Sequence, residues 1–279
     1  MILQLMDANI HLSNLTAGKE PIDVVDLDPF GSPAPFLDSA ARVISKRNGL
    51  LCITATDMPN LVGINKYTCL RKYGVVPLKT WYAHETAVRI LIAASVLAIT
   101  RHGHGAKPIL THSTDHYVRI YIAIQRGKEN AKKTVSQLGY LRHCDNCFTR
   151  EVRALSEFLG EYCPVCGETL RIGGPLWISE LANRHFVRQC INEAHLLHLG
   201  KKKDVITLLQ LIDGELEIAP TYFDLHLLSK KLKISSPPLQ KVITLLRKRG
   251  YKAARTHFKY TGFRTDASAS DVLDIVSTC

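Results

Sequence analysis

The stretch IDVVDLDPFGSP, residues 22–33, decides how this chain can fold. Its apolar and β-branched first half predicts a buried strand of a parallel sheet. Pro29 lacks a backbone N–H and so ends strand pairing, and Gly31 favours a loop. Asp28, Pro29 and Phe30 are therefore expected at the carboxyl end of a strand, the edge at which open α/β sheets bind their ligands.

The loop after this strand combines groups suited to chemistry on an aromatic amino group. Such an amine is a poor nucleophile because its lone pair is delocalised into the ring. Asp28 and the carbonyl of Pro29 can each accept one N–H, and the carboxylate stabilises the positive charge that develops on nitrogen. Phe30 offers a face on which a base can stack, and Gly31 lets a ligand approach the backbone. The alternative is a tight turn in which Asp28 caps the next helix.

A second apolar run, Leu50–Thr56, predicts the neighbouring buried strand. Its carboxyl end points at the same ligand edge, so Thr56 and Asp57 are candidates to line the pocket, with a strand-end cap as the alternative. A helical pattern over Ala34–Arg47 connects the two strands. The strongly apolar segment His84–Thr100 predicts a core helix rather than a partner surface.

Two later segments, Pro108–Ser113 and Tyr117–Arg126, read as a pair of strands that completes the sheet. The expected architecture is α/β, with a Rossmann-like sheet in a first domain over residues 1–130. A second, α+β domain is expected over residues 131–279. No run of 18 apolar residues and no signal-like start occurs, so no membrane segment is expected.

Four cysteines have the spacing of a zinc ribbon. Cys144 and Cys147 form one Cys-x-x-Cys pair, and Cys163 and Cys166 form a second after 15 intervening residues. Two such pairs place four thiolates around one tetrahedral ion, which leaves no open position for catalysis. The pattern predicts a structural zinc module over about residues 140–170, with disulfides or a redox pair as alternatives that fit a reducing cytoplasm poorly.

The charge of the chain favours a polyanionic partner. Of its 279 residues, 36 are lysine or arginine and 25 are aspartate or glutamate, so the net charge is +11. Eleven of these cations and no acid lie within residues 230–264, interleaved with aromatic side chains. Cations neutralise phosphates and aromatic rings stack on bases, so this window predicts RNA contact, although a solvated lysine face is the usual alternative.

The same region has the outline of a winged-helix module, at about residues 200–265. A helix after Tyr222 is followed by a turn at Ser235–Pro238, a second helix over Leu239–Arg249 and a hairpin-like tail. Residues 266–279 are polar and are expected to be a loosely held end with a short helix at most.

The string DVVDLDPFGSP resembles the catalytic loop of the tRNA (guanine-N2)-dimethyltransferases, which are class I S-adenosylmethionine-dependent methyltransferases. The resemblance extends over nearly the whole chain. It is carried by five further segments in the family's order: Thr54–Asp57, Arg71–Gly74, His84-Glu85, Asp115–Arg119 and Arg255–Phe258.

The resemblance implies methyl transfer from S-adenosylmethionine to N2 of guanine 26 in tRNA, once or twice. Asp28 would hold and deprotonate the amine, Pro29 would accept its second hydrogen, and Phe30 would stack on the flipped guanine. In the family, an Asp-Ala-Asn just before the catalytic strand meets the adenine of the cofactor. That assigns Asp7 and Ala8 to the cofactor, whereas spacing alone suggests a helix cap.

One departure from the family pattern concerns the start of the chain. Class I methyltransferases open with a strand, a glycine-rich turn and a helix that hold the methionine part of the cofactor, but the first glycine here is Gly18. We therefore expect the family fold without its amino-terminal portion. This departure leaves open a non-catalytic RNA- or DNA-binding protein that keeps a methyltransferase remnant. A second alternative, an amino methyltransferase acting on another nucleic acid, would share the chemistry of the loop.

Overall fold

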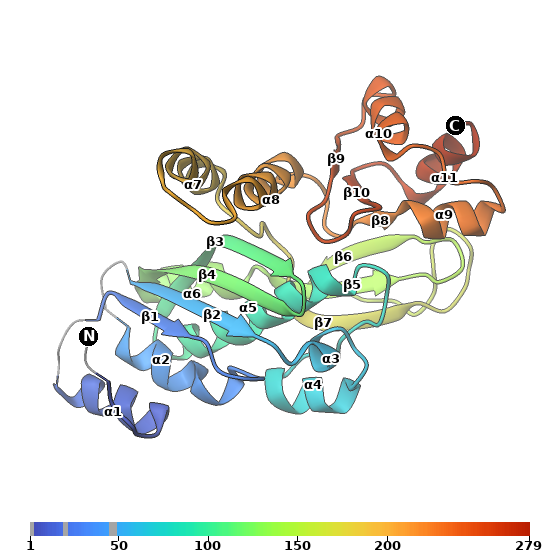
Figure 1. Cartoon of the computed structure of the whole chain (residues 1–279). Coiled ribbons are helices and arrows are strands. Elements are labelled where there is room, and N and C mark those ends of the chain that lie inside the picture. The colour runs from blue at the N-terminus through green and yellow to red at the C-terminus, as the bar shows by residue number, and fades with distance from the viewer. Residues whose placement is uncertain (1–2, 19–21, 45–48) are drawn as a thin grey trace.

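The computed structural model describes residues 3–18, 22–44 and 49–279. Within them the strands form three sheets, ordered β1-β2-β4-β3, β6-β5-β7 and β8-β10-β9. Figure 1 shows the first sheet beside helices α2 and α5, the second extending from its carboxyl edge, and the third among the last helices of the chain.

The first sheet contains the four predicted strands, and it is mixed. β1 (Val24–Leu27) pairs in parallel with β2 (Leu50–Ala55). β4 (Tyr117–Arg126) is antiparallel both to β2 and to β3 (His104–Thr114). Because β1 and β2 run in the same direction, the loops that follow them lie at one edge of the sheet.

A long apolar helix, α5 (Ala83–Arg101), packs against this sheet together with α2 (Leu37–Val43) and α6 (Lys128–Val135). By length and composition α5 could cross a membrane, but 78% of its apolar window is buried within the fold. The prediction of a core helix at this position is therefore confirmed. The final part of the helix predicted over Ala34–Arg47, residues 45–47, lies outside the described residues.

β1 differs from the predicted strand in one respect. Val25 and Leu27 are buried, but Val24 is 56% exposed and Asp26 also faces outward. The period-two alternation of a strand places these two side chains on the face opposite to the core. The prediction of a strand buried on both faces is therefore wrong for β1.

The second sheet continues the core of the first. It contains β5 (Leu138–His143), β6 (Arg150–Ala154) and β7 (Arg171–Trp177). Leu141 and Trp177 belong to the same buried cluster as α5. A helical hairpin, α7 (Arg184–Leu196) and α8 (Lys202–Glu215), then lies along β3 with a small core of its own.

The last part of the chain has a separate apolar cluster around the third sheet. Its elements are β8 (Phe223–Asp224), α9 (Leu225–Leu232), α10 (Leu239–Lys248), β9 (Ala253–Arg255), β10 (Gly262–Thr265) and α11 (Ala269–Ser277).

Helix α11 corrects the prediction of a loosely held end. Ser268 caps the helix by accepting from the Asp271 N–H at 3.1 Å. Val272, Ile275 and Val276 are buried in the cluster, because their spacing places them on one face of the helix.

A chain of buried charges, here called the charge ladder, joins the first sheet's helix to the end of the chain. Its members, in order of contact, are Arg89, Glu85, Arg264, Glu215 and His257. Each side chain is at most 5% exposed. The two carboxylates are shared between Arg89 of α5, Arg264 of β10 and His257 of the β9–β10 turn, so each carboxylate that leaves water has a partner.

The distances within the ladder are those of close ion pairs. Arg89 contacts Glu85 at 2.8 Å, Arg264 contacts Glu85 at 3.0 Å, and Arg264 contacts Glu215 at 2.8 Å. Burial alone would raise the pKa of Glu215, but Arg264 and His257 hold it at about 2. Glu215 is therefore ionised at neutral pH.

Truncating one member of the ladder should destabilise the whole fold. We expect Arg264→Met to lower the free energy of unfolding by about 3–5 kcal/mol, because two buried carboxylates lose a partner. Denaturant unfolding followed by circular dichroism measures this change. Arg188→Met is the control: Arg188 is 61% exposed and pairs with Asp213, so it should change stability by about 1 kcal/mol or less. Equal effects of the two variants would contradict the ladder's role.

Candidate active site and metal site

The loop over residues 28–33 leaves the carboxyl end of β1 toward α3 (Met58–Leu61) and α4 (Lys66–Tyr73) (Figure 1). Asp28 is exposed, Pro29 is half-buried, and the Phe30 side chain is fully exposed. A carboxylate and an aromatic ring are thus presented to solvent at the ligand edge, where the sequence placed them.

Two hydrogen bonds join this loop to the end of β2. The Gly31 N–H donates to Thr56 Oγ1 at 2.7 Å, and the Thr56 N–H donates to the Gly31 carbonyl at 2.9 Å. Gly31 adopts φ +86°, a left-handed conformation that a side chain would strain. The predicted proximity of Gly31 and Thr56 is present, and the Thr56 hydroxyl orients the loop backbone.

A buried tyrosine, Tyr73, connects the loop to Asp57, two residues after the end of β2. Tyr73 Oη donates to Asp57 Oδ1 at 2.6 Å and accepts from Ser32 Oγ at 2.9 Å. Burial raises the pKa of Tyr73, and its bond to Asp57 raises it further. The phenol therefore stays protonated and keeps donating to the carboxylate.

Asp57 itself is held from several sides. Its Oδ2 accepts from Asn60 Nδ2 at 2.8 Å and pairs with Lys72 at 3.2 Å. Sequence reasoning proposed Asp57 as a pocket residue but did not single out Tyr73, Ser32 or Lys72 for the site. In the sequence, Tyr73 was marked only by its place in Arg71–Gly74, one of the segments that carry the family resemblance. That resemblance does not show that Tyr73 bonds to Asp57.

A second anchor fixes the start of the loop from the outward face of the sheet. Arg119 on β4 makes a two-pronged ion pair with Asp26, at 2.9 and 2.7 Å, and donates to Thr54 Oγ1 at 2.7 Å. Burial alone would lower the pKa of Arg119, but its bonds to Asp26 and Tyr121 raise it. One guanidinium therefore joins β1, β2 and β4 just before Asp28.

The two residues assigned to the cofactor lie at the start of α1 (Ala8–Gly18). Asp7 Oδ1 accepts from the N–H groups of Asn9 at 2.9 Å and Ile10 at 3.2 Å. Asp7 thus caps α1, as its spacing suggested. A cap uses one carboxylate oxygen, so this geometry is compatible with a second role for the other oxygen.

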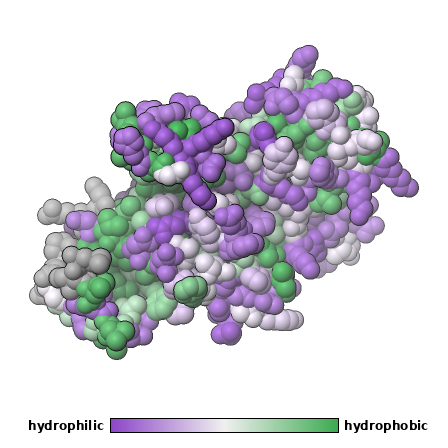
Figure 2. All heavy atoms as spheres, viewed as in Figure 1, coloured by the Kyte–Doolittle hydropathy of each residue, from purple (hydrophilic) through white to green (hydrophobic). Residues whose placement is uncertain are grey.

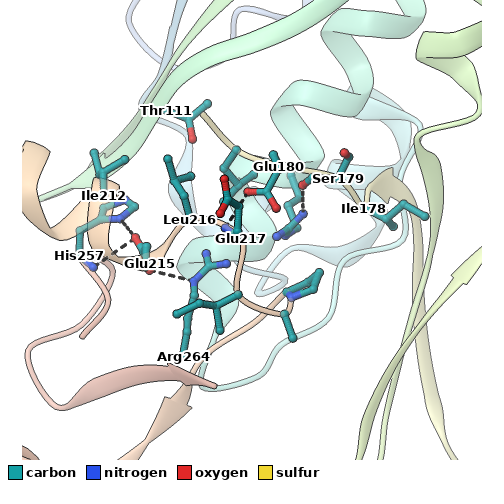
Figure 3. Close-up of a pocket in the computed structure, with 15 residues that line it drawn as sticks. Thr111, Ile178, Ser179, Glu180, Ile212, Glu215, Leu216, Glu217, His257 and Arg264 are labelled. Carbon is teal, nitrogen blue, oxygen red and sulfur yellow. Dashed lines mark hydrogen bonds and ion pairs between the residues drawn. The ribbon is translucent and has the colours of Figure 1, made fainter. Parts of the chain in front are cut away.

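A cavity of about 350 Å³ lies beside the charge ladder rather than at the loop over residues 28–33. Figure 3 shows Glu215, His257 and Arg264 around it, with Thr111 of β3 at the opposite wall. No residue of the loop over 28–33 lines it. We therefore do not assign the substrate to this cavity.

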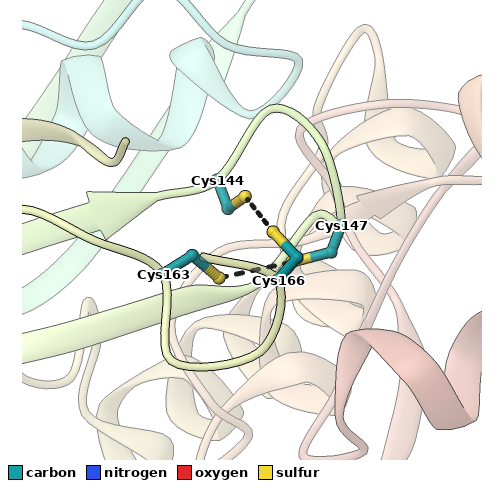
Figure 4. Close-up of side chains that lie close together, drawn as sticks. All are labelled: Cys144, Cys147, Cys163 and Cys166. Carbon is teal, nitrogen blue, oxygen red and sulfur yellow. Dashed lines mark hydrogen bonds between the residues drawn. The ribbon is translucent and has the colours of Figure 1, made fainter. Parts of the chain in front are cut away.

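The four predicted metal ligands come together (Figure 4). Their sulfur atoms all lie within 4.8 Å of one another, with 3.4 Å between Cys144 and Cys166 and between Cys147 and Cys163. Tetrahedral zinc with bonds of ~2.3 Å places its sulfurs roughly 3.8 Å apart, so this donor set fits the ion.

The backbone around the cysteines forms two matching turns. The Phe148 N–H donates to the Cys144 carbonyl at 3.1 Å, and the Gly167 N–H donates to the Cys163 carbonyl at 2.9 Å. Gly167 has φ +77°, which its position in the second turn requires. The two turns hold the paired thiols toward one centre.

The basic window over residues 230–264 lies mostly on the surface. Figure 2 shows hydrophilic residues over much of the α7–α8 hairpin and the end of the chain on this face. Ten of the window's eleven cations are exposed, and the exception is Arg264, which belongs to the charge ladder. Counting Arg264 as an RNA-facing cation was therefore wrong.

Comparison with known proteins gives one consistent answer. A family model described as N2,N2-dimethylguanosine tRNA methyltransferase matches residues 1–277. A tRNA (guanine(26)-N(2))-dimethyltransferase of Methanobrevibacter smithii is 41% identical over 92% of this chain and 66% of its own length. One of Methanosphaera stadtmanae is 39% identical over 98% of this chain and 70% of its own length.

A solved structure is also similar. It is Trm1 from Pyrococcus horikoshii in complex with S-adenosyl-L-methionine, with a TM-score of 0.87 and 34% identity. The match covers 98% of this chain and 70% of that one. The chain thus spans about two thirds of the length of the relatives that it matches.

Removing the Tyr73 hydroxyl should loosen the loop without opening the core. We expect Tyr73→Phe to cost about 1–3 kcal/mol in unfolding free energy, because Asp57 and Ser32 lose a buried partner. Amide exchange over residues 28–33 should quicken, as measured by hydrogen–deuterium exchange. Tyr67→Phe, at a side chain that is 83% exposed on α4, should change neither quantity. Unaltered exchange in Tyr73→Phe would refute the anchoring role.

Proposed function

Since the chain belongs to the N2,N2-dimethylguanosine tRNA methyltransferase family, we propose that it methylates N2 of guanine 26 in tRNA, with S-adenosylmethionine as the methyl donor. The observation that carries the proposal is the loop over residues 28–33. It presents a carboxylate, a proline carbonyl and an exposed aromatic ring at the ligand edge, and the hydrogen bonds that Gly31 and Ser32 donate to Thr56 and Tyr73 hold it in place.

Asp28 and Pro29 act on the guanine amine. The carboxylate of Asp28 accepts one N–H and the Pro29 carbonyl accepts the other, so the lone pair of the nitrogen turns out of the ring plane. S-adenosylmethionine supplies an electrophilic methyl group when bound. As positive charge develops on nitrogen, Asp28 stabilises it and takes the proton. A second transfer is possible because the monomethylated amine keeps one hydrogen for Asp28.

Phe30 holds the base for this reaction. Guanine in a stem is stacked and paired, so its amine is reached only after the nucleotide flips out. The ring of Phe30 is fully exposed and supplies a face for the flipped base. Gly31 beside it has open space where a Cβ would lie, so the base can approach the backbone there.

Thr56 and Asp57 act as neighbours of the substrate in this proposal. Thr56 fixes Gly31, and Asp57 is held by Tyr73, so both keep the loop in its working shape. Asp7 and Ala8 are proposed to meet the adenine of the cofactor, Asp7 as acceptor and the Ala8 N–H as donor. Support comes from their place in the family pattern and from the capped start of α1.

The remaining domain is proposed to bind tRNA. We propose that zinc at the four cysteines folds the ribbon and does no chemistry, since four thiolates complete its coordination.

The segment around α9, α10 and the β9–β10 hairpin is proposed to be a winged-helix-like module. The exposed cations of this region favour contact with phosphates. None of the eight cysteines is in a disulfide, which suits the proposed location in a reducing compartment, the cytoplasm.

The direct test is transfer of labelled methyl groups into unmodified tRNA, followed by nucleoside analysis. We expect N2-methylguanine and N2,N2-dimethylguanine from the protein, and a rate at least about 100-fold lower from Asp28→Asn. Asp38→Asn, at a carboxylate exposed on α2, is the matched control and should be fully active. Full activity of Asp28→Asn would overturn the assigned role. A protein that binds tRNA but transfers no label would favour the non-catalytic alternative.

The metal assignment has its own test. The purified protein should contain one zinc per chain by atomic emission spectrometry, and Cys163→Ser should lose it. Because the ion holds the two turns together, metal loss should unfold the ribbon and lower the melting temperature. Cys190→Ser, at a half-buried cysteine on α7, should keep the metal. A protein that retains its melting temperature after the metal is stripped would contradict the structural role.

A further inference from the structure

The turn between β9 and β10 is attached firmly to the first sheet's core. Phe258 is 8% exposed and belongs to the same buried cluster as α5. Its ring stacks on Tyr222, with centroids 6.0 Å apart. His257 next to it is the last member of the charge ladder. The tip of this hairpin therefore cannot move independently of the domain that carries the catalytic loop.

The turn is also closed on itself. The Gly262 N–H donates to the Lys259 carbonyl at 2.9 Å, and the Thr256 N–H donates to the Gly262 carbonyl at 3.3 Å. A Cβ on Gly262 would meet Thr256 Cγ2 at 2.6 Å, so the two arms approach as closely as glycine allows. One backbone conformation results, and side chains on the turn have fixed directions.

One large side chain on this rigid turn faces solvent. Tyr260 is 84% exposed. The guanidinium of Arg255 lies over its ring, 5.1 Å from the centroid, and donates to the Tyr260 carbonyl at 3.4 Å. A cation on one face of an aromatic ring orients it and leaves the other face available to stack.

The hairpin tip and the catalytic loop flank the same edge of the sheet. Thr111 of β3 and His257 of the β9–β10 turn line the same cavity. His84 Nδ1 is 3.3 Å from Ser113 Oγ at the end of β3. β3 and β1 are three strand spacings apart in the sheet, which is about 14 Å. A few nucleotides of one RNA strand can therefore extend from the loop over residues 28–33, after β1, to the hairpin tip beside β3.

We propose that Tyr260 is an RNA-stacking residue that holds a nucleotide beside the target guanine. This inference rests on the proposed function and names a specificity-determining contact for it. An exposed ring with a guanidinium over one face suits a base and its phosphate better than an apolar protein surface. Phe30 would hold the flipped guanine, and Tyr260 would hold the strand next to it, so the rigid link between them sets their separation.

The test uses tRNA that carries 2-aminopurine in place of the nucleotide on either side of guanine 26. Stacking on Tyr260 should quench its fluorescence on binding. Tyr260→Ala should abolish the quench and weaken tRNA binding roughly 5- to 150-fold. Tyr260→Phe should preserve both, and Tyr260→Leu, which keeps bulk without an aromatic face, should behave like Tyr260→Ala. Unchanged melting temperatures would show that all three variants fold.

Failure of this inference differs from failure of the proposed function. Suppose that the unaltered protein binds and methylates tRNA, and that Tyr260→Ala binds tRNA and quenches the 2-aminopurine fluorescence equally well. The stacking role is then overturned and the activity stands. If Tyr260→Leu behaves like Tyr260→Phe, the contact is apolar packing and the stacking role is also overturned. Asp28→Asn should keep the quench while losing methyl transfer. A protein that neither binds nor methylates tRNA would overturn both proposals.

Discussion

The buried carboxylate of Glu85 is the constraint on which the relative placement of the parts depends. It lies at the start of α5 with no exposed surface, and its cationic partners come from α5 itself and from β10, near the end of the chain. A charge in that position is tolerated only while both cations are present. The electrostatic requirement therefore brings Arg264 to α5, and the β9–β10 hairpin comes with it to the ligand edge of the first sheet.

A second feature concerns how the loop over residues 28–33 is held in place while its side chains stay exposed. Asp28 and Phe30 are exposed at the ligand edge, while the groups that hold the loop are less accessible: Tyr73 is buried, and Arg119, which joins the strands, is half-buried. Because Tyr73 and Arg119 hold the loop, Asp28 and Phe30 need not pack against the protein. They stay exposed, as the roles proposed for them require. Positioning groups before the reaction avoids reorganising them during it.

The sequence predicted what local pattern controls. The strand that ends at Asp28, the core helix α5, the antiparallel strand pair and the four-cysteine cluster were all visible in spacing and composition. The roles of Tyr73, Arg119 and the charge ladder were not, because each depends on contacts between residues far apart in the chain, and periodicity carries no information about them.

The packing of α11 was missed for another reason: its three apolar residues were outweighed by the polar composition of residues 266–279, although Ser268 and their spacing would have identified it. The roles proposed for Asp7, Ala8, Asp28, Pro29 and Phe30 still rest on the family pattern and the geometry together.

The burial of Phe258 has a consequence for how the protein is made. The core around α5 takes in Leu141, Trp177, Tyr222 and Phe258, which come from segments far apart in the chain. The interior around α5 is therefore complete only after Phe258 has been synthesised. Until then, part of the apolar surface of α5 and β4 stays exposed and is open to aggregation. Efficient production in the cell should accordingly depend on chaperones that shield nascent chains.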